Sequence, residues 1–123
     1  MSNASDSPKI VDREVLRELC QLEGEEGQDF LTELFEIFKQ TATEDINKLE
    51  AAIAAREAMQ IYRLAHKLKG SCLPLGANRL SVVCASLEKE AKEGRIDEAV
   101  QFLEKIKEEY KILLQHFKEE FGI

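Results

Sequence analysis

The side chain with the clearest capacity for chemistry is the imidazole of His66, one of only two histidines in the sequence. A neutral imidazole is a competent nucleophile, and imidazoles titrate near neutral pH. His66 lies in the run Ala65-His66-Lys67-Leu68-Lys69-Gly70-Ser71. At 100° per residue in a helix, His66 is about 135° from the centre of the apolar stripe. We therefore expect the imidazole to face solvent.

The neighbours of His66 indicate a use for this exposure. Gly70 lies one turn later on the same face, where a glycine costs about 1 kcal/mol relative to alanine. Its missing side chain would leave the imidazole open to a large partner. Met59 and Leu73, seven residues to either side, make the face partly apolar, as a docking surface requires. Lys69, three residues after His66, can place positive charge near an anionic group on the imidazole ring.

Each of these features also has a purely structural explanation. A single histidine on a helix surface is commonly a solvated residue, and a helical glycine often accommodates packing. Met59 and Leu73 could belong to a wider core stripe. His116, near the end of the last predicted helix, is interpreted as a solvated surface residue.

Composition excludes several classes of function. The net charge is −7 with a pI of about 4.9, and no basic face is visible, which disfavours binding to nucleic acid. No apolar run approaches the roughly 20 residues that cross a bilayer, and no signal peptide is recognisable. We therefore expect a cytoplasmic protein that does not associate with membranes.

The three cysteines, Cys20, Cys72 and Cys84, have no CxxC spacing. We expect them to pack as small hydrophobic residues rather than to form disulfides or bind metal. A metal site that combines His66 with Cys72 is disfavoured, because the two side chains face nearly opposite directions on one helix. We therefore predict no metal-ligating residues in this sequence.

Apolar residues recur at steps of three and four, the period of an amphipathic helix. The pattern predicts five helices and no strand. They are a short helix capped by Asp12, long helices over 28–55 and 57–73, a fourth from Asn78 and a fifth capped by Asp97. Four substantial helices joined by short loops make an all-α antiparallel four-helix bundle, with the short additional N-terminal helix at one end.

Glycine and proline mark the expected helix ends. The polar segment 23–27 contains two glycines and should break the chain before the first long helix. Pro74 must kink or end the third helix because it lacks an N–H. Gly76 suits a left-handed cap, and Gly94 should close the fourth helix.

The length of 123 residues suits one domain. Residues 1–9 are small, polar and unpatterned, so we predict a disordered lead that includes a cloning remnant, Ser2-Asn3-Ala4. Residues 10–121 are predicted to form the single domain.

Several motifs resemble the signature of histidine-containing phosphotransfer (HPt) domains. The run His66-Lys67-Leu68-Lys69-Gly70-Ser71-Cys72, followed by Leu75-Gly76-Ala77 and Leu80, carries the resemblance. The run Cys84-Ala85-Ser86-Leu87-Glu88 continues it. The resemblance extends from about residue 10 to residue 121, because the order and lengths of the helices also fit.

Two departures accompany the resemblance. Cys72 stands where a second serine or an alanine is common, which should be harmless. Pro74 interrupts the usual small residues before Leu75 and Gly76, so it can shift the end of the third helix.

The resemblance implies a four-helix bundle with an exposed, phospho-accepting histidine. By position, His66 is the acceptor, Lys69 supports the phosphoryl charge and Gly70 leaves room for the partner. Glu88 is at the position of a polar residue on the next helix that hydrogen-bonds the imidazole. By accepting from Nδ1–H, Glu88 would fix the tautomer and leave Nε2 free for attack.

The implied function is that of a phosphorelay intermediate. His66 would accept a phosphoryl group reversibly from the aspartate of one receiver domain and pass it to another. The partners would be receiver domains of response regulators and of hybrid histidine kinases, and Mg²⁺ is expected in the receiver rather than in this chain. We expect a monomeric carrier without its own nucleotide site or kinase activity. The alternative is a helical scaffold, or a degenerate module that no longer accepts phosphate.

Overall fold

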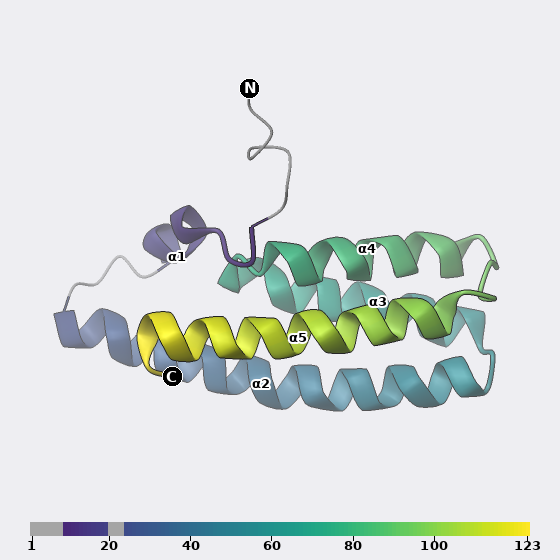
Figure 1. The fold of residues 1–123 in the computed structure, drawn as a ribbon, viewed down its shortest axis with the longest axis horizontal. Coiled ribbons are helices and arrows are strands. Elements are labelled where there is room, and N and C mark those ends of the chain that lie inside the picture. The colour runs from purple at the N-terminus through teal and green to yellow at the C-terminus, as the bar shows by residue number, and fades with distance from the viewer. Residues whose placement is uncertain (1–8, 20–23) are drawn as a thin grey trace, which may run out of the picture.

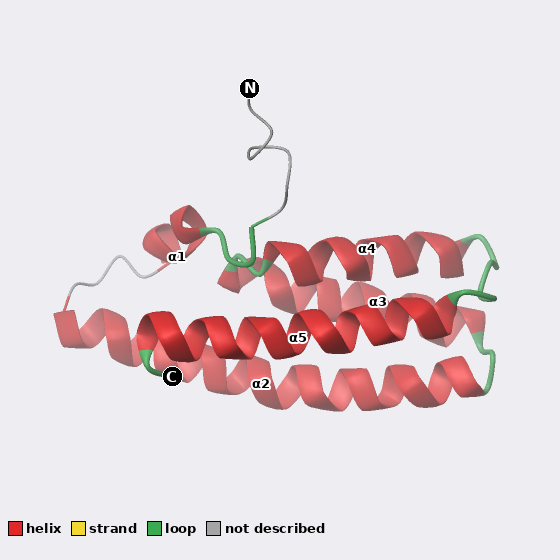
Figure 2. Cartoon of the chain, viewed as in Figure 1, coloured by secondary structure: helices red, strands yellow, loops and turns green. Residues whose placement is uncertain are grey.

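The chain forms a bundle of helices. The computed structural model describes residues 9–19 and 24–123, and no strand occurs among them (Figure 2). The predictions for residues 1–8 and for Cys20 concern positions outside the described residues. The helices are α1 (Arg13–Leu19), α2 (Gly24–Ala54), α3 (Ala58–Cys72), the 3-10 helix η2 (Leu73–Leu75), α4 (Asn78–Lys92) and α5 (Ala99–Phe121).

Four long helices lie side by side and enclose the core (Figure 1). Contacts link α2 to α3, α3 to α4, α4 to α5 and α5 back to α2, which closes the bundle. Short α1 contacts η2 at one end. The predicted apolar stripes face inward, and the rings of Phe35 and Phe117 stack with centroids 4.2 Å apart. The described residues thus confirm the predicted all-α class and the five helices.

The prediction of a helix break at 23–27 is wrong from residue 24 onward, because α2 already begins at Gly24. Packing outweighs the intrinsic cost of glycine here. Gly27 is buried, and Gln28 Nε2 donates a hydrogen bond to the Phe121 carbonyl at 3.2 Å. The first turns of α2 are thereby held against the end of α5, a contact that the sequence pattern does not reveal.

One of the two predicted aspartate caps is confirmed. Asp12 Oδ1 accepts from the Glu14 backbone N–H at 2.9 Å, which caps α1. Asp97 is not a cap, because α5 begins at Ala99 and no side chain caps it. The Asp97 carboxylate instead accepts from Arg56 Nη2 at 2.8 Å. This contact joins the α4–α5 loop to the α2–α3 loop.

The turn between α3 and α4 follows the predicted signals. Helix α3 ends at Cys72 and tightens into η2, which contains Pro74. Gly76 is left-handed, with φ 65° and ψ 26°, and its N–H donates to the Leu73 carbonyl at 3.0 Å. The Gly76 carbonyl accepts from the Asp12 N–H at 2.7 Å, so this turn also holds the start of α1.

Replacing Gly76 by alanine should destabilise the fold more than replacing Gly94. Both glycines have positive φ, which costs an L-residue about 1–2 kcal/mol. At Gly76 an added Cβ would also lie 2.8 Å from the Asp12 carbonyl oxygen. At Gly94 it would meet no atom of the described residues within 4 Å. We expect an additional loss of about 1–3 kcal/mol for Gly76→Ala, measured by urea unfolding; equal losses in the two variants would contradict this packing.

Candidate functional site

The imidazole of His66 projects from the exposed face of α3. Its side chain is 61% exposed, whereas Leu68 on the opposite face is fully buried. This arrangement confirms the predicted orientation of the helix. The ring of Tyr62, one turn earlier, stacks beside the imidazole with centroids 6.2 Å apart. Tyr62 was missed as part of the site, although its spacing of four residues from His66 could have indicated it.

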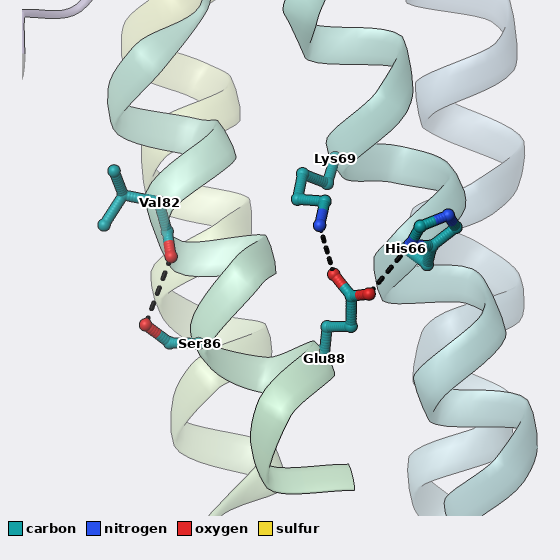
Figure 3. Close-up of polar contacts among 5 residues, drawn as sticks. All are labelled: His66, Lys69, Val82, Ser86 and Glu88. Atoms are coloured by element: carbon teal, nitrogen blue, oxygen red, sulfur yellow. Dashed lines mark hydrogen bonds and ion pairs between the residues drawn. The ribbon is translucent and has the colours of Figure 1, made fainter. Parts of the chain in front are cut away.

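Glu88 reaches across from α4 and joins two groups of α3. Its Oε2 lies 2.7 Å from His66 Nδ1, and its Oε1 lies 2.7 Å from Lys69 Nζ (Figure 3). The Glu88 side chain is only 14% exposed because it lies between the two helices. The structure therefore brings together His66, Lys69 and Glu88, three residues that the sequence analysis selected.

The hydrogen bond to Glu88 determines which nitrogen of the neutral ring is available. A carboxylate can only accept, so Nδ1 carries the proton and donates it to Glu88. The lone pair of the neutral imidazole is then on Nε2. The arrangement orients a nucleophile on an exposed helix face and holds its ring in place.

The charges around Glu88 keep its carboxyl group ionised. Burial by itself would raise the pKa of Glu88, but the hydrogen bonds from Lys69 and His66, together with their charges, hold that pKa below its ordinary value. The ammonium group of Lys69 in turn points toward the Glu88 carboxylate. The group beside His66 is thus a stable hydrogen-bond acceptor at neutral pH.

The surface around the imidazole is open and partly apolar. A Cβ added to Gly70 would meet no atom of the described residues within 4 Å. Met59 and Leu73 are 59% and 57% exposed, so they are not part of a wider core stripe. Gly70 therefore relieves no packing conflict, and the face presents apolar surface on both sides of His66.

Two buried acidic side chains escaped the sequence analysis. Asp45 of α2 is 1% exposed and accepts from Lys67 Nζ at 3.0 Å. Glu109 of α5 is also buried and accepts from Arg79 of α4 at 2.8 Å. A charge within an apolar helical stripe is the signal that could have identified both. Asp45 matters for the site because its partner directly follows His66.

The remaining candidates lie apart from this chemistry. Cys72 and Cys84 are free and buried, and their mutual hydrogen bond together with burial raises the pKa of the Cys84 thiol. Both pack as predicted. His116 is half-buried on α5, and its ring lies nearly perpendicular to that of Phe117. Over the described ranges, no cluster of three or more His, Cys, Asp or Glu residues could hold a metal ion. No described helix is long and apolar enough to cross a membrane.

Comparison with known proteins relates this geometry to one family. The family model described as "Hpt domain" matches residues 33–119. The crystal structure of histidine-containing phosphotransfer protein B from Pseudomonas aeruginosa superposes with a TM-score of 0.82 at 28% identity, covering 94% of this chain and 97% of that one. The match includes the helices that carry His66 and Glu88.

Two curated relatives are similar in sequence. Histidine-containing phosphotransfer protein 2 of Arabidopsis thaliana is 25% identical over 109 residues, which cover 86% of this chain and 70% of that protein. Sensor protein TorS of Escherichia coli is 35% identical over 80 residues, which cover 65% of this chain. That match spans only 8% of the sensor protein, so it concerns one small part of a much longer chain.

Glu88→Gln should lower stability at neutral pH and much less in acid. Because the pKa of Glu88 is lowered on folding, the carboxylate stabilises the fold above its ordinary pKa of about 4.3 and ceases to do so as the pH falls through the lowered value. Urea unfolding of both proteins at pH 7 and pH 3 measures the difference. The exposed control Glu104→Gln should match the wild type at both pH values. A Glu88→Gln deficit that is independent of pH would contradict the assignment.

Proposed function

This chain belongs to the Hpt domain family, and we propose that it serves as a phosphorelay intermediate that carries a phosphoryl group on Nε2 of His66. The observation that supports the acceptor most directly is the exposed imidazole whose Nδ1 is held by the carboxylate of Glu88 at 2.7 Å. A surface histidine without a role has no need of such a partner. The open space at Gly70 supports the same proposal.

The transfer would follow ordinary phosphoryl chemistry. Nε2 of His66 attacks the phosphorus of an aspartyl phosphate on a receiver domain. The new N–P bond forms as the P–O bond to the aspartate breaks, and the aspartate leaves with the electron pair as a carboxylate. Glu88 keeps the Nδ1 proton in place throughout, and Lys69 is close enough to turn its ammonium toward the phosphoryl oxygens. Transfer to a second receiver reverses these steps.

Most of the remaining catalysis would come from the partner. Mg²⁺ held by the receiver would neutralise charge on the phosphoryl group, and this chain would contribute the nucleophile and a surface on which the receiver docks. We therefore infer a carrier without kinase activity of its own. The partners would be receiver domains of response regulators and of hybrid histidine kinases, and we propose a cytoplasmic monomer.

His66→Gln should abolish acceptance of phosphate while leaving the fold intact. The side chain faces solvent, where substitutions usually change stability by less than about 0.5 kcal/mol. Incubation with phosphorylated receiver domains, followed by mass spectrometry of this chain, measures the transfer. His116→Gln is the matched control and should transfer normally. Acid-labile labelling that persists in His66→Gln would place the acceptor elsewhere.

Gly70→Gln should separate docking from chemistry. A better helix former should leave stability equal or raise it by several tenths to about 1 kcal/mol, because the Cβ of the new side chain points into open space. Transfer from a receiver should become far slower, since the side chain would project over the docking surface. Phosphoramidate, a small donor that needs little clearance, should still label His66.

The two rates measured for Gly70→Gln decide between explanations. Unchanged transfer from the receiver would mean that the surface beside Gly70 is not covered during transfer. Equal failure with both donors, in a protein that remains folded, would mean that Gly70 shapes the imidazole site itself.

A further inference from the structure

The two lysines that follow His66 are each held by a carboxylate of a different neighbouring helix. Lys69 Nζ lies 2.7 Å from Glu88 Oε1 on α4, and Lys67 Nζ lies 3.0 Å from Asp45 Oδ1 on α2. Without a phosphoryl group, both ammonium groups are therefore occupied. The two carboxylates differ in the hydrogen-bond partners that each would keep if its lysine moved away.

Glu88 can release its lysine at lower cost than Asp45 can. Its other oxygen, Oε2, still accepts from His66 Nδ1, so the carboxylate would keep one hydrogen-bond partner after Lys69 had moved away. Within the described part of the chain, Asp45 has no second hydrogen-bond partner. Its side chain is 1% exposed, and its second oxygen, Oδ2, has no hydrogen-bond partner among the described residues. Departure of Lys67 would leave a buried carboxylate without any partner, which is strongly unfavourable.

We propose that Asp45 is a positioning residue that withholds Lys67 from the phosphoryl group on His66, so that Lys69 alone responds to phosphorylation. The inference rests on the proposed function of His66. It adds a reason for a buried charge beside an exposed reaction site. A single lysine would then contact the phosphoryl oxygens before transfer.

Withholding the second lysine would keep the phosphoryl group transferable. Lys67 and His66 are adjacent and point about 100° apart on the helix, but the lysine stem is flexible and its side chain is 56% exposed. If it were freed, Lys67 could turn toward the phosphoryl oxygens. A contact made only in the phosphorylated ground state must be broken before the receiver takes the group, so it slows transfer and hydrolysis. Asp45 prevents this contact.

Asp45→Asn tests the proposal directly. The amide is similar in size but cannot form the ion pair that holds Lys67. With His66 labelled by phosphoramidate and the donor removed, the phosphohistidine of Asp45→Asn should survive longer, by roughly threefold, the effect of one partly exposed ion pair. Transfer to a receiver should slow in parallel. An unchanged or shorter lifetime would overturn the proposal, because loosening of the fold alone would not protect the phosphohistidine.

Two further variants assign the effect to Lys67. Lys67→Gln by itself should leave the lifetime unchanged, because Lys67 does not contact the phosphoryl group in the wild type. The double variant Asp45→Asn with Lys67→Gln should return to the wild-type lifetime. A lifetime that stays long in the double variant would show that Asp45 acts through another group. Failure of the wild type to become labelled on His66 would instead reject the proposed function itself.

A measurement on the wild type does not depend on the folding of Asp45→Asn. Lysine side-chain NMR signals, assigned with Lys67→Gln and Lys69→Gln, should be recorded before and after labelling with phosphoramidate. The Lys69 signal should shift and the Lys67 signal should stay. A shift of Lys67 as large as that of Lys69 would overturn the proposal, whatever the behaviour of Asp45→Asn.

Discussion

The carboxylate of Glu88, shared between His66 and Lys69, is the interaction on which the site depends. It joins an exposed face of α3 to a nearly buried position on α4, with both contacts at 2.7 Å. The hydrogen bond defines the imidazole tautomer, and the ion pair determines where the lysine charge rests. Both functions require the two helices to keep one rotation and one register relative to each other, because a shift of one residue would turn Glu88 by about 100°.

That register is maintained by the connection between α3 and α4 and by the packing beneath it. Pro74 ends α3, and Gly76 turns the chain in a left-handed conformation that brings α4 back along α3. The start of α1 is bonded to the same turn through Asp12 and Gly76, so the short helix supports the connection. On the buried side, Leu68 and Cys84 are fully enclosed. An exposed nucleophile is thus carried by a helix whose other face cannot rotate without exposing the core.

Two ion pairs with buried carboxylates add a second level of specification. Asp45 with Lys67 joins α2 to α3, and Glu109 with Arg79 joins α4 to α5. Such pairs contribute little net stability, but removal of the basic partner leaves an unpaired buried carboxylate, which typically costs about 3–5 kcal/mol. They therefore penalise alternative rotations of these helices more than they strengthen the native one. In the pair between α2 and α3, Asp45 restrains Lys67, the residue that directly follows His66.

The helical class, the exposed orientation of His66 and the turn at Pro74 and Gly76 could all be predicted from the amino-acid sequence, because they follow from local periodicity and from backbone preferences of single residues. The Hpt-like motif also selected Lys69, Gly70 and Glu88 by position. Local patterns failed where distant segments meet. Helix α2 starts at Gly24, where Gln28 bonds to Phe121 at the end of α5, and Asp97 pairs with Arg56 instead of capping α5.

The pairing of the charges could not be read from the sequence and follows from the packing of the helices. From sequence, Asp45 is one acidic residue among 24, and Lys67 is a solvent-facing lysine beside a histidine. Their partnership, and the sharing of Glu88 between Lys69 and His66, arise because α2 and α4 lie on either side of α3. Helical periodicity specifies which way a side chain points on its own helix, but not which helix it faces. The distances between charges on different helices, which decide the electrostatics of the site, exist only after the bundle has assembled.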